Sequence, residues 1–308
     1  MEIKLNEKYD FYGLVNEINV STYDSYPVIV TLTDKTKTVV RLDKSEVVER
    51  GTIYHFIGTG VLFKNKIHIL ADTVKALDDE PLEDVYKLAV KNLFSFTMTV
   101  DLASCQKLIE DTINNLENEV IKNITSTIYN KYKEKFLVYP AATKFHHSYK
   151  NGLLLHTYNM LRLSFAYTEI YPNINNDLVY SGIILHDMMK TRELNDLSSE
   201  YTVEGKLIGH ISLGAEEIVK VGAELGYSDT PEVLLLTHIL LSHHEEPLYG
   251  SPKRPQIIEA LIIHLCDMAD AQIEPAIEGL ERVKIGEFTD PIFTNNKEKF
   301  YKHPLSKE

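Results

Sequence analysis

The stretch LVYSGIILHDMMK, residues 178–190, decides how the rest of the chain is interpreted. Its apolar residues fit a helix, and the run ends in His186, Asp187 and Lys190. An imidazole and a carboxylate buried without partners would cost several kcal/mol, and a bound metal ion would remove that cost. Neighbouring helical residues point in different directions, so one ion reaches both only near the helix surface. The pattern therefore predicts a metal centre that needs further ligands from elsewhere.

Further candidate ligands follow in order across residues 152–271. Upstream lies His156, and downstream lie His210, His243, His244 and Asp267. A lone histidine is usually a core or surface residue, but this ordered set favours a common role. Histidine combined with carboxylate is typical of sites for Zn, Fe or Mn rather than Ca or Mg. His264, one turn before Asp267, is a further candidate, with a core role as the alternative.

The ordered set resembles the HD-domain metal-dependent phosphohydrolases. The segments NGLLLHTYNML (151–161), ILHDMMK (184–190) and LLSHHEEP (240–247), behind a small N-terminal β-domain, resemble one branch, the YhaM-type 3′-5′ exoribonucleases of Gram-positive bacteria. The resemblance covers nearly the whole chain and is most specific over residues 140–275. It implies cleavage of single-stranded RNA, or single-stranded DNA, from the 3′ end to nucleoside monophosphates.

The resemblance also implies two divalent ions and a division of the ligands. Mn²⁺ is the favoured metal, with Fe, Co, Mg and Zn as alternatives. Two ions about 3.5–4 Å apart can share a hydroxide and stabilise the attacking and leaving oxygens at phosphorus. Lys190 would donate to a non-bridging phosphate oxygen, with a surface lysine as the alternative. The first ion would be held by His156, His186, Asp187 and Asp267, and the second by His210, His243 and His244, with Asp187 bridging.

The composition is that of a globular protein with room for two domains. The chain has 308 residues, of which 44% are hydrophobic and 25% charged. It contains no apolar run of membrane-spanning length and no N-terminal apolar leader, and its two cysteines indicate no disulfide framework. These features predict a cytoplasmic protein. The net charge of −13 argues against a coat of nucleic acid, so contacts with a polyanion must be local.

Residues 1–75 predict a small barrel. Five β-branched or alternating runs are separated by polar breaks, and an OB-fold, which binds single strands by base stacking in a positive groove, is the leading candidate. Residues 64–66 are a candidate hairpin tip. The alternative is that the aromatics are core and the lysines solvated. The candidate contacts are Tyr12, Tyr23, Tyr26, Phe56, Phe63, Lys35, Lys37, Arg41, Lys64 and Lys66.

The remainder is predicted to be all-helical. Residues 76–140 would form a helical linker, with self-association into a homo-oligomer as an alternative role. Residues 141–275 would form the HD domain, with its last ligand helix at 255–268, and residues 276–308 a C-terminal extension. Besides Lys64 and Lys66, the candidate substrate contacts are His146, His147, Lys253 and Arg254.

Two rival functions remain open. The first is an HD phosphohydrolase acting on a small nucleotide, either a dNTP or a signalling nucleotide. The second is a non-catalytic single-strand-binding factor, which the intact ligand set disfavours. The sequence holds no phosphate loop of the P-loop type and no G-x-G-x-x-G or G-x-S-x-G motif, so no competing catalytic pattern is present.

Overall fold

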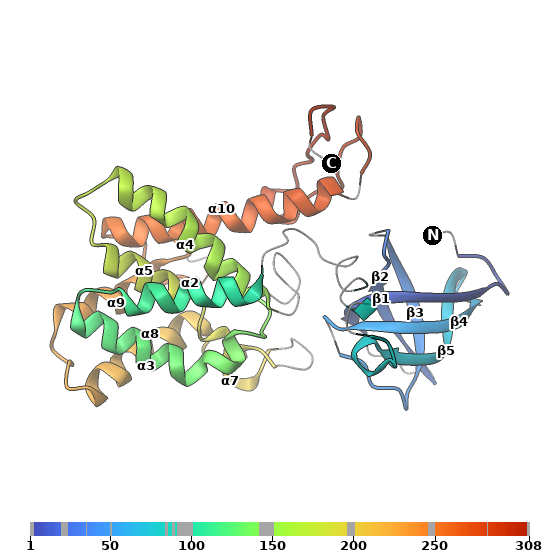
Figure 1. The fold of residues 1–308 in the computed structure, drawn as a ribbon, viewed down its shortest axis with the longest axis horizontal. Coiled ribbons are helices and arrows are strands. Elements are labelled where there is room, and N and C mark those ends of the chain that lie inside the picture. Colours follow the sequence, from blue (N-terminus) through green and yellow to red (C-terminus); the bar gives the residue numbers. More distant parts are fainter. Residues whose placement is uncertain are drawn as a thin grey trace. The chain divides into compact units, whose positions relative to one another are not determined.

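The computed structural model describes residues 3–19, 24–34, 36–49, 51–83, 86–87, 90, 101–141, 151–195, 201–245, 250–281 and 283–306. The chain divides into two compact units (Figure 1). One comprises residues 1–99, which hold the N-terminal strands, together with residues 277–292 and 298–308. The other comprises residues 100–276, which hold the helices from Leu102 onward, together with residues 293–297. Within the described ranges, no helix is both long enough and apolar enough to cross a membrane.

The N-terminal unit contains a closed five-stranded barrel with the strand order β1-β2-β3-β5-β4. All neighbouring strands are antiparallel except β3 and β5, which are parallel. This small barrel is OB-like and confirms the predicted fold. The strands are β1 (Lys8–Ile18), β2 (Ser25–Thr31), β3 (Lys37–Asp43), β4 (Ile53–Phe63) and β5 (Lys66–Ala76).

Side chains of β4 alternate between the barrel interior and its outer surface. Tyr54 and Phe56 point inward and are buried, whereas His55 and Phe63 are partly exposed. Phe56 is fully buried in the barrel core, so the expectation that it could stack on substrate is wrong for this residue. A β-branched and aromatic interior fills a barrel this narrow, which leaves only outward positions for contacts with a ligand.

The turn between β4 and β5 is a two-residue hairpin. Lys64 and Asn65 both have positive φ, at 47° and 65°, and Phe63 pairs with Lys66. Two consecutive left-handed residues match the right-handed twist of the flanking strands. The predicted hairpin tip at residues 64–66 is confirmed.

The second unit is helical. Asn118 and Asn175 cap α3 and α5 by accepting a hydrogen bond from a first-turn backbone N–H, and Pro231 begins α9. The helices are α2 (Leu102–Asn114), α3 (Glu119–Phe136), α4 (Gly152–Ile170), α5 (Asn176–Leu185), α6 (Lys190–Glu193), α7 (Val203–Leu207), α8 (His210–Glu224), α9 (Pro231–Ser242) and α10 (Ile258–Glu281).

One apolar core joins these helices. Ile109 of α2 and Ile124 of α3 are fully buried in the same cluster as Ile183 of α5 and Ile263 of α10. The helices between residues 101 and 140 are therefore packed as part of the helical unit. The last ligand helix is longer than predicted, because α10 continues past Pro275, which lies inside the helix, to Glu281.

Candidate metal centre

The His-Asp doublet lies where α5 ends. The helix finishes at Leu185, and the backbone N–H of His186 still bonds the carbonyl of Gly182. His186 and Asp187 then occupy the turn before α6, and both are buried. Gly182 lets α5 approach its neighbours closely, because a Cβ there would lie 2.4 Å from Ile263 Cδ1. The tight packing of α5 thus fixes the position of the doublet.

Five other predicted ligands are brought to the same place by four further elements. His156 comes from the middle of α4, and His210 is the first residue of α8. His243 and His244 directly follow α9, and Asp267 lies in α10. The structure therefore brings all seven predicted ligand residues together from separate parts of the helical unit.

Potential ligand atoms form two groups, each of which could hold a metal ion. One group contains His156, His186 and Asp187, and the other contains Asp187, His210, His243 and His244. In each group the ligand atoms lie within 4.8 Å of one another. Asp187 is common to both.

The two carboxylates lie between the imidazoles. Asp187 Oδ2 is 3.3 Å from His186 Nε2, and Asp187 Oδ1 is 3.3 Å from His210 Nε2. Asp267 Oδ1 is 3.3 Å from His156 Nε2, and Asp267 Oδ2 is 3.8 Å from His244 Nε2. Asp267 thus reaches both sides of the centre.

Three of the imidazoles, those of His186, His243 and His210, are held by their Nδ1 atoms, which directs Nε2 toward the centre. His186 Nδ1 bonds the carbonyl of Ile183 at 2.7 Å, and His243 Nδ1 bonds that of Leu240 at 2.8 Å. His210 Nδ1 lies 3.0 Å from the Glu193 carboxylate. This arrangement is typical of histidines that bind a metal, because the outer hydrogen bond sets tautomer and orientation.

Several inward-facing atoms have no hydrogen-bond partner among the residues that the structure describes. They are Nε2 of His186, His210 and His243, together with Asp187 Oδ1, and all are buried. Buried polar atoms are normally satisfied, so a group of four is unusual. Divalent cations bound at the two ligand groups would satisfy all four, and the donor set of imidazole and carboxylate suits such ions.

The electrostatics of the centre keep its carboxylates ionised. Burial alone would raise the pKa of Asp187, but Lys190, His186 and His210 hold it well below the usual value. Burial would lower the pKa of His156, but hydrogen bonds with Asp267 and Asp270 raise it to about 10. The aspartates thus attract positive charge, whether it is carried by protons or by metal.

Lys190 contacts the centre directly. Its Nζ donates to Asp187 Oδ2 at 2.6 Å, and its side chain is almost buried. Burial would lower the pKa of the ammonium, but the nearby Asp187 carboxylate outweighs this effect and raises it. The cation therefore remains charged at the edge of the candidate metal site.

Sequence reasoning missed two supporting carboxylates. Asp270 Oδ2 lies 2.6 Å from His156 Nδ1, and its other oxygen accepts from Asn159 at 2.9 Å. Glu193 holds His210 through its ring and also through its backbone N–H at 3.0 Å. Asp270 stands three residues after Asp267, on one helix face, and that spacing could have revealed it.

His264 is engaged outside the two ligand groups. Its Nδ1 bonds the carbonyl of His243 at 2.9 Å, and its Nε2 lies 3.1 Å from Glu245. It therefore supports the backbone of the His243–His244 doublet.

Of the candidate substrate contacts in the helical unit, Lys253 and Arg254 are exposed, while His146 and His147 lie outside the described residues. Tyr23 and Lys35, two of the candidate contacts in the barrel, also lie outside the described residues.

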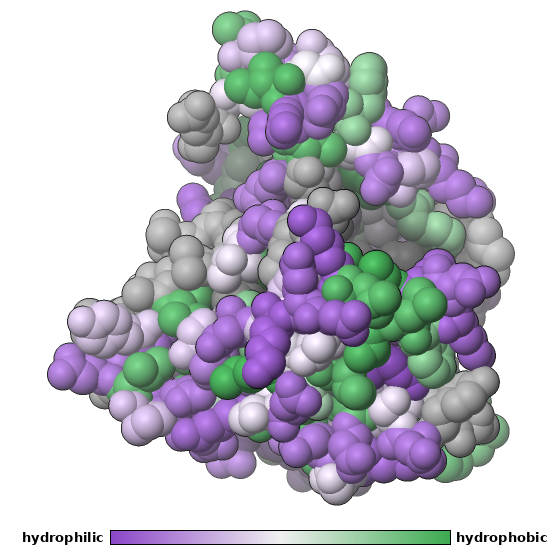
Figure 2. All heavy atoms as spheres, turned by 90° about the vertical axis from the view of Figure 1, so that its right-hand side faces the viewer, coloured by the Kyte–Doolittle hydropathy of each residue, from purple (hydrophilic) through white to green (hydrophobic). Residues whose placement is uncertain are grey.

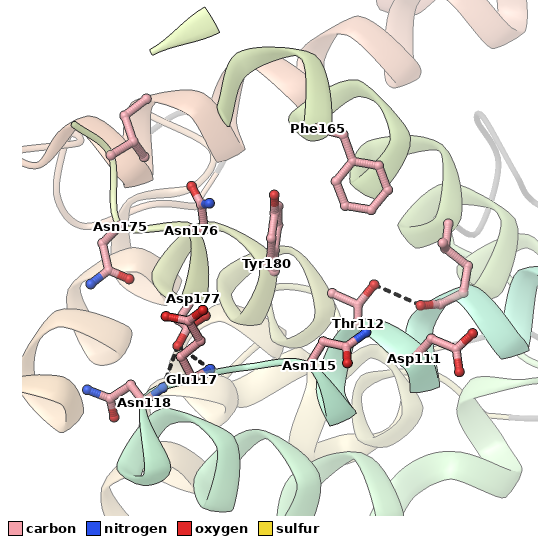
Figure 3. A pocket seen from close by; sticks show the side chains of 12 residues that line it. Asp111, Thr112, Asn115, Glu117, Asn118, Phe165, Asn175, Asn176, Asp177 and Tyr180 are labelled. Atoms are coloured by element: carbon pink, nitrogen blue, oxygen red, sulfur yellow. Dashed lines mark hydrogen bonds between the residues drawn. The ribbon is translucent and has the colours of Figure 1, made fainter. Parts of the chain in front are cut away.

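A surface cleft of about 600 Å³ lies apart from these seven residues (Figure 3). It is lined by polar residues around the start of α3 and α5, with Phe165 and Tyr180 on one side. Asp177 accepts from the backbone N–H groups of Glu117 and Asn118 at 2.9 and 2.6 Å. Its carboxylate thereby caps the start of α3, which is a structural role.

Comparison with known proteins places this helical centre in a class. The sequence profile of the HD domain matches residues 153–272, the segment that contains all seven candidate ligands. The fold and the site thus define an HD-domain protein with an N-terminal OB-like barrel.

Individual relatives identify the family within this class. The chain is 38% identical over 253 residues to the 3′-5′ exoribonuclease YhaM of Bacillus licheniformis, covering 82% of this chain and 76% of that protein. It is 37% identical over 258 residues to the Bacillus subtilis protein of the same name, covering 83% and 78%. A Geobacillus relative with that name is 44% identical over 195 residues, covering 63% and 60%. The chain belongs to the YhaM family, as its resemblance to that family predicted.

Proposed function

We propose that the protein is a metal-dependent 3′-5′ exoribonuclease that degrades single-stranded RNA to nucleoside monophosphates. Two independent lines support this activity: the names of the relatives and the chemistry of the buried centre. The observation that carries it is the position of Asp187, which belongs to both groups of potential metal ligands. A carboxylate shared between two groups is suited to bridge a pair of cations.

In this proposal the first ion would be held by His156, His186, Asp187 and Asp267. The second would be held by His210, His243 and His244, with Asp187 shared between the two sites. A divalent metal, for which Mn²⁺ is favoured over Fe, Co, Mg or Zn, would supply Lewis acidity and would lower the pKa of bound water.

The chain's own residues would orient the scissile phosphate. Lys190 carries a positive charge beside Asp187 and can donate to a non-bridging phosphate oxygen as negative charge accumulates there. Glu193 and Asp270 would keep two histidine rings in position. The burial of the centre would limit the access of bulk water to the reacting group.

Residues outside the metal centre would bind the single-stranded RNA. The barrel would hold single-stranded RNA, or single-stranded DNA, through Lys64 and Lys66, and the helical unit through His146, His147, Lys253 and Arg254. Such contacts fit an acidic protein, because each acts locally on the phosphate backbone. We also propose that the protein acts in the cytoplasm.

A direct assay tests the proposal. Purified protein with Mn²⁺ is incubated with single-stranded RNA labelled at its 5′ end, and separately with free dNTPs and signalling nucleotides. We expect a ladder of RNA shortened from the 3′ end. Turnover of free nucleotides alone would instead identify a small-nucleotide phosphohydrolase, and RNA binding without cleavage would identify a non-catalytic factor.

A further inference from the structure

We propose that RNA docks on one end of the barrel, at a surface formed by Phe63, Lys64, Lys66 and His68 next to the buried guanidinium of Arg41, which we call the Phe63 surface. The inference rests on the proposed RNA substrate and adds where the strand is held. It also excludes a second aromatic surface, formed by Tyr12 and His55, which we call the Tyr12 surface. Sequence alone made Tyr12 and Phe63 equal candidates.

Strand register places the Phe63 surface on the outside of the barrel. Phe63 pairs with Lys66 across the β4–β5 hairpin, and His68 pairs with Val61 two positions further along. Arg41 pairs with Leu70 on β5, the next outward position after His68. Because side chains two residues apart in a strand share a face, these groups lie on one side of the barrel wall. Arg41 is buried there, at 3% exposure, because its guanidinium donates to Ser25 and lies against Phe63. Phe63, Lys64, Lys66 and His68 therefore form the part of this surface that a ligand can reach.

The rings and cations on this surface contact one another. The Arg41 guanidinium lies 3.7 Å from the centre of the Phe63 ring, and the His68 ring lies 5.7 Å from it. Lys64 Nζ, at the hairpin tip, lies 5.8 Å from the same ring. Phe63 is only partly buried, so part of its ring faces solvent. A partly exposed aromatic ring among cations suits a base and its phosphate together.

Two outward-facing histidines of the barrel, His68 and His55, have pKa values that are shifted in opposite directions. The pKa of His68 is lowered by burial and by the charges of Arg41 and Lys66. Burial would also lower the pKa of His55, but Asp10 and Glu80 raise it instead. His55 and Phe63 are eight residues apart on β4, about 26 Å along the strand. One end of this strand is therefore positive and the other negative.

The Tyr12 surface also contains a pair of stacked aromatic rings. The Tyr12 and His55 rings lie 4.7 Å apart with an angle of 25° between their planes. However, His55 contacts Asp10 at 2.6 Å and Glu80 at 3.0 Å, so two carboxylates border the stack. Those carboxylates would repel phosphate, so stacking alone does not make this a site for RNA.

Matched substitutions in the full-length protein separate the two surfaces. Fluorescence anisotropy with a labelled single-stranded RNA, in EDTA to prevent cleavage, would give the affinity of each variant. We expect Phe63→Ala to weaken binding about tenfold, in line with the loss of one base–aromatic stack. Phe63→Tyr should restore it, and Tyr12→Ala should leave it unchanged.

A second measurement does not depend on removing the ring. Lys66→Ala should reduce the slope of log affinity against log salt by about one, because one phosphate contact is lost. Unchanged binding by both Phe63→Ala and Lys66→Ala, or weaker binding by Tyr12→Ala than by Phe63→Ala, would overturn the inference. If the unmodified protein neither binds nor shortens RNA, the proposed function itself fails. If it shortens RNA while these variants bind normally, only the docking surface is wrong.

Discussion

The metal centre and the Phe63 surface differ in how far their charged groups are exposed to solvent. In the helical unit, the ligand side chains are buried, apart from the partly buried His210 and His244, and outer hydrogen bonds hold several of the rings in place. On the barrel, Lys64 lies in a hairpin tip and Lys66 at the start of β5, and both are exposed to solvent. Figure 2 shows that hydrophilic and hydrophobic residues are interspersed on the face of the molecule in view. Burial makes each ligand of the centre hard to replace, whereas exposed contacts add small, salt-screened contributions.

The largest effect is expected at Asp187. Asp187→Ala removes the only residue common to the two ligand groups and should lower cleavage by about a thousandfold or more, because the metal contributes several kcal/mol to the reaction. RNA affinity in EDTA should change little. Asp111→Ala, which removes an exposed carboxylate paired with Lys107, serves as the control. Cleavage that survives Asp187→Ala would refute the assignment of the centre.

A smaller effect is expected from a residue that supports a ligand. Asp270→Ala removes the hydrogen bond that holds His156 and should weaken divalent metal binding by about 10–100-fold. Asp270→Asn should restore part of the affinity, since its amide oxygen can still accept from His156 Nδ1. Calorimetric titration with Mn²⁺ measures both. Equal affinity in Asp270→Ala and the unmodified protein would show that His156 needs no such support.

Backbone packing near Glu193 should also matter. A Cβ at Gly205 would lie 2.2 Å from the carbonyl oxygen of Glu193, so Gly205→Ala must displace the backbone of that residue. We expect a loss of about 1–3 kcal/mol in the free energy of unfolding. Urea unfolding measures the loss, and Lys206→Ala on the same short helix is the control. A neutral Gly205→Ala would mean that α6 and α7 can separate without cost.

The smallest effect concerns the acidic end of the barrel. The pKa of His55 is raised in the folded protein because, despite burial, Asp10 and Glu80 stabilise its charged form. Its contribution to stability is therefore full below the unfolded pKa, about 6.5, and is lost as pH rises through the higher folded pKa. Lys75 and Tyr12 also face this cluster. Thermal melting should show a weaker decline above neutral pH in His55→Gln than in the unmodified protein; identical profiles would contradict this account.

Local sequence patterns predicted both the barrel and the candidate metal ligands. Alternation with a period of two indicated the strands, and the ordered set of histidines and aspartates indicated the centre. Glu193 and Asp270 were not predicted as supports for the ligand histidines, because the residue that contacts the outer nitrogen of a histidine depends on how the helices pack. Phe56 was misplaced because aromatic character alone does not give the face of a strand. The choice between Phe63 and Tyr12 needed the positions of distant acids such as Glu80.

Cleavage of an end-labelled strand tests the central claim most directly. Single-stranded RNA labelled at its 5′ end should be shortened stepwise from the 3′ end by the unmodified protein with Mn²⁺, and should stay intact with Asp187→Ala. Full-length RNA persisting with the unmodified, metal-loaded protein would contradict the account. Equal shortening by both proteins would contradict it as well.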